Sequence, residues 1–120
     1  MAIAVTACSD DKSKSRQRYY VELEVSNMRY GFSGRFSELR ALHQRLQNTA
    51  VRHAVAKHDI AKDQVPKFPS RYWLRNMRSP ENRALREKEL FRYYGALFRC
   101  EATRQWLIPQ CDQVVKNNIR

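Results

Sequence analysis

The feature that most constrains the fold of this chain is a strict alternation of side-chain character over residues 19–26. Successive side chains of a β-strand point to opposite faces of a sheet, so an alternating segment has one face to bury and one to expose. The apolar row is Tyr19, Val21, Leu23 and Val25, and the opposite row is Tyr20, Glu22, Glu24 and Ser26. We therefore predict a strand at about 18–26.

Weaker alternation before and after this segment predicts two further strands, at about 2–8 and 29–34. Ile3 and Val5 alternate with smaller or polar neighbours, and Phe32 continues an apolar row between two glycines. A polar run precedes the second strand, and a short turn joins the second to the third. The three strands are expected to form a small antiparallel sheet.

The hydrophobic period changes to that of a helix after the third strand. The residues at helical spacing are Leu39, Leu42, His43 and Leu46. This pattern predicts a helix at about 37–48 with Ser37 as its N-cap, because a serine hydroxyl can accept a hydrogen bond from a free amide of the first turn.

Prolines and a second helix start divide the rest of the chain. Pro66 and Pro69 exclude a regular helix and favour an extended arm at 65–74. Ser79 and Pro80 are typical of a helix start, because serine caps the first turn and proline suits the first helical position. The helices expected after the arm span about 80–99, 102–108 and 110–118.

These elements define the expected fold class. With 120 residues, the chain has room for one domain, which we expect to span residues 1–120. The class is α+β: a small three-stranded antiparallel sheet packed against a helical subdomain of three to four helices, with the proline-containing arm between the first and second helices.

The charge balance indicates an anionic partner. Lys and Arg number 23 against 12 Asp and Glu, which gives a formal net charge of +11. An excess of this size favours nucleic acid or an acidic membrane surface, and charge alone does not choose between them.

Residues typical of catalysis or metal binding form no recognisable motif. Cys8, Cys100 and Cys111 are far apart and include no Cys-x-x-Cys pair, so neither a disulfide framework nor a zinc site is implied. The histidines lack paired spacing with acids or cysteines, and no nucleophile-base motif is present. We expect no enzyme activity, no metal and no cofactor, in a cytoplasmic protein.

Three short motifs occur in a fixed order among these elements. Arg35-Phe36-Ser37-Glu38-Leu39 lies between the third strand and the first helix, and Pro66-x-x-Pro69-x-Arg71 lies in the arm. In the long helix, Arg86 is followed by Leu90 and Tyr93 four and seven residues later. Together with the order of strands and helices, this set resembles the phox-homology (PX) domain, a phosphoinositide-binding module, from residue 3 to residue 107.

The resemblance implies a role for each motif. Arg35 would bind the 3-phosphate, Phe36 would pack on the inositol ring, and Arg71 would meet the phosphate that joins inositol to diacylglycerol. Arg86 would hydrogen-bond the 4- and 5-hydroxyls, with Arg83 as an alternative for that role. We refer to Arg35, Phe36, Arg71 and Arg86 as the candidate slot. A phosphorylated ring needs separate cationic donors and a flat apolar wall, which these residues supply.

The arm also carries large apolar side chains among basic ones, a mixture expected of a loop that enters a membrane interface. The residues expected to contact the membrane are Phe68, Tyr72, Trp73 and Leu74. The resemblance implies a monomer that binds phosphatidylinositol 3-phosphate and associates peripherally with endosomal membranes, and it leaves room for protein partners in trafficking.

Plainer interpretations of the same residues stay open. Arg35 can pair with a surface carboxylate, Phe36 can belong to the core, and Arg86 can pair with Glu89 or another acid. Trp73 can cover the core beneath the arm instead of facing lipid.

Two alternative functions also stay open. A basic nucleic-acid binder would use the net charge and tyrosines among arginines as stacking surfaces, although no nucleic-acid motif is present and no nucleic-acid partner is expected. A PX fold with a degenerate lipid slot would act instead as a protein-interaction module.

Overall fold

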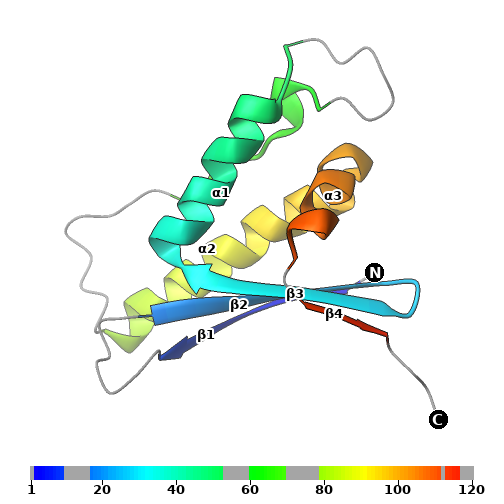
Figure 1. Ribbon diagram of the computed structural model, residues 1–120. Coiled ribbons are helices and arrows are strands. Elements are labelled where there is room, and N and C mark those ends of the chain that lie inside the picture. The colour runs from blue at the N-terminus through cyan, green and yellow to red at the C-terminus, as the bar shows by residue number, and fades with distance from the viewer. Residues whose placement is uncertain (1, 10–16, 53–59, 70–78, 112, 117–120) are drawn as a thin grey trace.

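Within the described residues, an antiparallel sheet with strand order β1-β2-β3-β4 carries three α-helices on one side (Figure 1). The computed structural model describes residues 2–9, 17–52, 60–69, 79–111 and 113–116. The strands are β1 (Ala2–Ser9), β2 (Gln17–Val25), β3 (Met28–Arg35) and β4 (Gln113–Lys116), and the α-helices are α1 (Phe36–Thr49), α2 (Pro80–Arg99) and α3 (Glu101–Leu107). Short 3-10 helices, η1 (Lys62–Gln64) and η2 (Ile108–Gln110), follow α1 and α3. The predicted α+β class is confirmed.

The turn between β2 and β3 sets the register of the sheet. Ser26 and Asn27 both have positive φ, at 51° and 64°, between the paired residues Val25 and Met28. A two-residue turn with positive φ at both residues matches the twist of the flanking strands, and asparagine tolerates positive φ. The resulting register pairs Arg18 with Arg35 at the other end of the hairpin.

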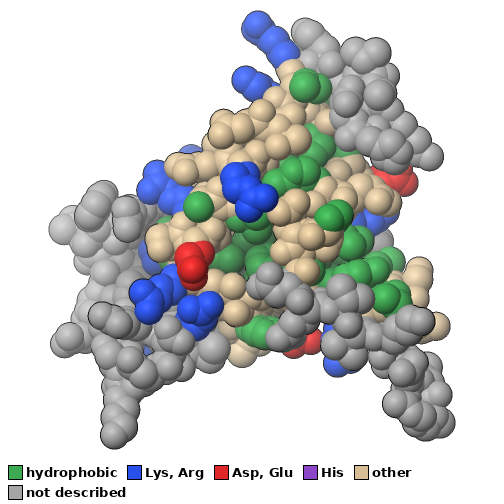
Figure 2. Space-filling view, viewed as in Figure 1, with side chains coloured by type: hydrophobic (Ala, Val, Ile, Leu, Met, Phe, Trp, Pro, Cys, Tyr) green, Lys and Arg blue, Asp and Glu red, His purple; other side chains and the backbone are tan. Residues whose placement is uncertain are grey.

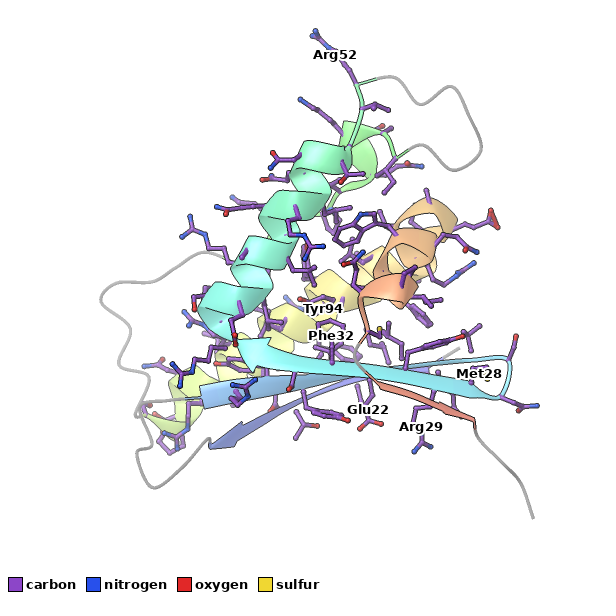
Figure 3. All side chains as sticks on the ribbon, in the orientation of Figure 1. Glu22, Met28, Arg29, Phe32, Arg52 and Tyr94 are labelled. Atoms are coloured by element: carbon purple, nitrogen blue, oxygen red, sulfur yellow. The ribbon has the colours of Figure 1, made fainter. Side chains whose placement is uncertain are left out.

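The apolar row of β2 faces the helices and forms the centre of the core. Val21 and Leu23 are fully buried, and Phe32 of β3 points from the sheet toward Tyr94 of α2 (Figure 3). The rings of Phe32 and Tyr94 meet edge to face, with centroids 5.5 Å apart. The alternation in the sequence therefore determines which face of the sheet receives α2.

The helix predicted at about 110–118 is wrong, because residues 113–116 form β4 and pair antiparallel with β3. Two adjacent β-branched residues, Val114 and Val115, suit a strand, and the hydrogen-bonding edge of β3 is available to them. Residues 28–31 of β3 pair with residues 113–116 of β4. The sheet therefore has four strands in the described part of the chain, where three were predicted.

The starts of α1 and α2 differ in detail from the sequence prediction. Arg35, not Ser37, is the N-cap of α1, and its backbone N–H donates to Glu38 Oε1 at 2.7 Å. The carboxylate of Glu38 thus satisfies the first free amide without a serine cap. Ser79 is the N-cap of α2 as predicted, but its hydroxyl donates to Glu81 Oε2 at 2.9 Å.

Two neighbouring tyrosines of α2 differ in their hydrogen bonding. Tyr93 and Tyr94 are both buried. The hydroxyl of Tyr93 shares a 2.7 Å hydrogen bond with Nδ1 of His43, whereas the buried hydroxyl of Tyr94 has no hydrogen-bond partner within the described residues. Burial raises the pKa of both hydroxyls, so both stay protonated.

This difference predicts opposite effects of the same substitution at adjacent positions. Tyr93→Phe breaks a buried hydrogen bond and should lower the free energy of unfolding by about 1–2 kcal/mol. Tyr94→Phe removes an unpaired hydroxyl and should leave that free energy within about 0.5 kcal/mol or raise it. Urea unfolding of both variants checks this, and equal losses at the two positions would contradict it.

Candidate functional site

The guanidinium of Arg86 lies over the ring of Phe36. Arg86 of α2 is 7% exposed and Phe36, the first residue of α1, is 9% exposed. The central carbon of the guanidinium is 3.8 Å from the ring centroid. A cation held this close to an aromatic face is attracted by the negative charge of the π system, and the attraction grows when water is excluded. Two residues that are far apart in the sequence therefore meet at one point.

Arg35 directly precedes Phe36 in the chain, so its backbone lies next to the residue that contacts Arg86. It ends β3, caps α1 and is exposed. Its backbone is fixed on one side by pairing with Arg18 and on the other by the hydrogen bond to Glu38. The strand-to-helix junction therefore holds an exposed arginine, Arg35, next in the chain to the ring that contacts the buried Arg86.

Phe68 anchors the proline arm against this junction. Its ring lies 5.2 Å from that of Phe36, stacks on His43 at 5.2 Å, and meets Tyr93 edge to face at 5.0 Å between centroids. We call Phe36, His43, Phe68 and Tyr93 the aromatic stack. It joins α1, the arm and α2, so the arm is held where the Arg86–Phe36 contact is made.

Two residues of the candidate slot, Phe36 and Arg86, are in contact, and a third, Arg35, is next to Phe36 in the chain. Phe36 also belongs to the core, as the plainer interpretation of that residue proposed. Arg83, the alternative to Arg86, is only partly buried. The candidate-slot residue Arg71 lies outside the described residues.

The expected membrane contacts require one correction. Phe68 is 8% exposed and packs inside the aromatic stack, so the prediction that it contacts lipid is wrong. The sequence of an extended arm does not specify which of its side chains turn inward. Tyr72, Trp73 and Leu74 fall outside the described residues.

The sequence places His43 in the apolar pattern of the first helix, but it does not predict the place of His43 in the aromatic stack. His43 is buried, and its partner Tyr93 is fifty residues away in the chain. Desolvation, and secondarily the charge of Arg40, lowers the pKa of His43 below its usual 6.5. Its place in line with Leu39 and Leu46 was the only signal in the sequence, and it could not reveal the partner.

Basic side chains surround the site. Figure 2 shows lysine and arginine side chains along α1 and at the junction of β3 with α1, where they lie next to an acidic one. None of the helices in the described part of the chain is long and apolar enough to cross a membrane.

Comparisons with known proteins identify the family and agree with the fold. The family model described as "PX domain" matches residues 26–106. A solved structure titled "X-ray structure of a designed CISK-PX domain" aligns with a TM-score of 0.71 at 15% identity, covering 94% of this chain and 100% of that one. No curated protein matches the chain significantly. The chain belongs to the PX domain family.

Family membership gives the general class of function. The chain is a phosphoinositide-binding module that associates peripherally with membranes. PX domains are generally non-enzymatic lipid-binding modules.

The lowered pKa of His43 predicts a loss of stability in acid. As the pH falls below about 6.5, the unfolded chain binds a proton at this residue more readily than the folded chain does, so the free energy of unfolding falls. His43→Asn keeps a neutral acceptor for Tyr93 and should reduce the difference in melting temperature between about pH 7.5 and about pH 5.5. An unchanged difference in the variant would show that other groups cause the acid sensitivity.

Proposed function

We propose that this chain recognises phosphatidylinositol 3-phosphate and thereby targets itself, or an assembly that contains it, to endosome-like membranes. The observation that supports this most is the contact between Arg86 and Phe36, 3.8 Å from guanidinium carbon to ring centroid, directly after the exposed Arg35 in the chain. Arginine binds phosphate through paired, charge-assisted hydrogen bonds, so an exposed arginine beside a fixed aromatic ring suits a phosphorylated ring-shaped headgroup.

The two arginines have different parts in this proposal. Arg35 is exposed and can reach a ligand that arrives from the solvent, so we assign it the 3-phosphate. Arg86 is buried and held by Phe36, so its side chain loses little further entropy when a ligand binds. We therefore assign it the ring hydroxyls. In this proposal the main role of Phe36 is to position Arg86.

The arm completes the proposed membrane contact. Arg71 binds the phosphate that links the headgroup to the lipid tails, and Tyr72, Trp73 and Leu74 enter the interface. The net charge of +11 adds a general attraction to acidic lipid, worth about 1 kcal/mol for each basic residue near the surface. The chain would act as a cytoplasmic monomer at the endosomal surface and leave its other faces for protein partners in trafficking.

Headgroup recognition can be separated from general attraction by two matched variants. Arg35→Ala should reduce binding to vesicles that contain phosphatidylinositol 3-phosphate by about tenfold or more, because it removes the proposed phosphate contact. Arg29→Ala removes the same charge from the opposite end of β3, where Arg29 lies 4.0 Å from Glu22, and should change binding by less than about twofold.

Vesicle sedimentation with phosphatidylinositol 3-phosphate, or with unphosphorylated phosphatidylinositol, provides the measurement. Equal binding of wild type and Arg35→Ala to the phosphorylated vesicles would falsify the proposal. A steeply salt-dependent affinity for RNA or DNA, without any preference among lipids, would instead support the nucleic-acid alternative.

A further inference from the structure

β2 places another arginine directly across the sheet from Arg35. Arg18 and Arg35 are Cα partners in the register of the β2–β3 hairpin. Like charges at directly opposite positions of an antiparallel pair are destabilising, so such a pair needs an anion close by. The candidate slot contains neither Arg18 nor that anion.

Glu38 places a carboxylate beside Arg18 and the backbone of Arg35. Its Oε1 atom accepts the hydrogen bond from the Arg35 N–H at 2.7 Å, and the same atom lies 4.0 Å from Nη2 of Arg18. The side chains of Arg18 and Glu38 are 32% and 60% exposed. An exposed ion pair at this distance is weak, so a stronger anion can replace the carboxylate at little cost.

Gly34 gives Glu38 the room to lie against β3. A Cβ atom at position 34 would lie 3.3 Å from Cβ of Glu38 and 3.5 Å from Cδ2 of Leu39. The first of these distances is tighter than an ordinary contact. Glycine at this position therefore favours the placement of Glu38 against β3, near the Arg18 side chain.

We propose that Arg18 is a further phosphate-binding residue, which joins Arg35 on one phosphate when the headgroup displaces Glu38. The inference rests on the proposed function, since Arg35 must bind that phosphate first. A phosphomonoester carries close to two negative charges at neutral pH, whereas the phosphodiester of a lipid backbone carries one. Two arginines from neighbouring strands match the doubly charged group, so the Arg18–Arg35 pair selects a lipid-borne phosphomonoester.

Three variants isolate this role. Arg18→Gln should lower the affinity for vesicles that contain phosphatidylinositol 3-phosphate by about fivefold to tenfold. Arg29→Gln is the matched control, because it also removes one basic charge and one 4.0 Å ion pair, and Figure 3 shows Arg29 and Glu22 on the face of the sheet away from the helices. Glu38→Gln keeps an acceptor for the Arg35 N–H but removes the competing charge, so it should raise the affinity.

Vesicles with phosphatidylinositol 3-phosphate, or with phosphatidylinositol and added phosphatidylserine at equal total charge, give the readout. Circular dichroism and melting temperature establish that each variant is folded. The inference predicts that Arg18→Gln loses affinity only for the phosphorylated vesicles. Equal affinities of Arg18→Gln and Arg29→Gln overturn it.

Two further outcomes separate failures of different kinds. If Arg35→Ala loses binding while Arg18→Gln behaves like its control, the proposed function stands and the role of Arg18 is rejected. If wild type shows no preference for the phosphorylated lipid, both proposals are rejected. Full competition by inorganic phosphate at equal concentration would assign the pair to free phosphate and overturn the lipid assignment.

Discussion

The contact between Arg86 and Phe36 is the interaction on which the site depends. A buried guanidinium loses its hydration, and that cost must be offset by groups that face it. The ring of Phe36, 3.8 Å from the guanidinium carbon, provides part of that compensation, worth up to about 2 kcal/mol when water is excluded. Because Phe36 follows Arg35 directly, the contact between Arg86 and Phe36 brings α2 close to the backbone of Arg35.

The aromatic stack holds α1, the arm and α2 together beside this contact. Phe68 lies between Phe36 and His43, and the His43–Tyr93 hydrogen bond closes the stack against α2. The described part of the arm is therefore held by packing at Phe68. Side chains that are already held in place lose less conformational entropy when a ligand binds.

Periodicity predicted the elements that carry a local sequence pattern with one buried face. The alternation over residues 19–26 and the helical spacing from Leu39 to Leu46 reflect one buried face each, and both elements formed where expected. β4 was predicted as a helix because pairing with the edge of β3 is a tertiary interaction without a local pattern. Phe68 was predicted to face lipid for a similar reason, because an arm without hydrophobic periodicity does not show which side chains are buried. The pairing of Arg18 with Arg35 could not be predicted, because it depends on the register of the hairpin.

The central proposal is that Arg35 and Arg86 hold a single headgroup beside Phe36. A crystal structure with a short-chain phosphatidylinositol 3-phosphate tests it most directly. We predict the 3-phosphate within hydrogen-bonding distance of the Arg35 guanidinium, with Arg86 still over the Phe36 ring and donating to the inositol hydroxyls. A headgroup bound elsewhere, or one that contacts Arg35 while Arg86 remains out of reach of it, would contradict the claim.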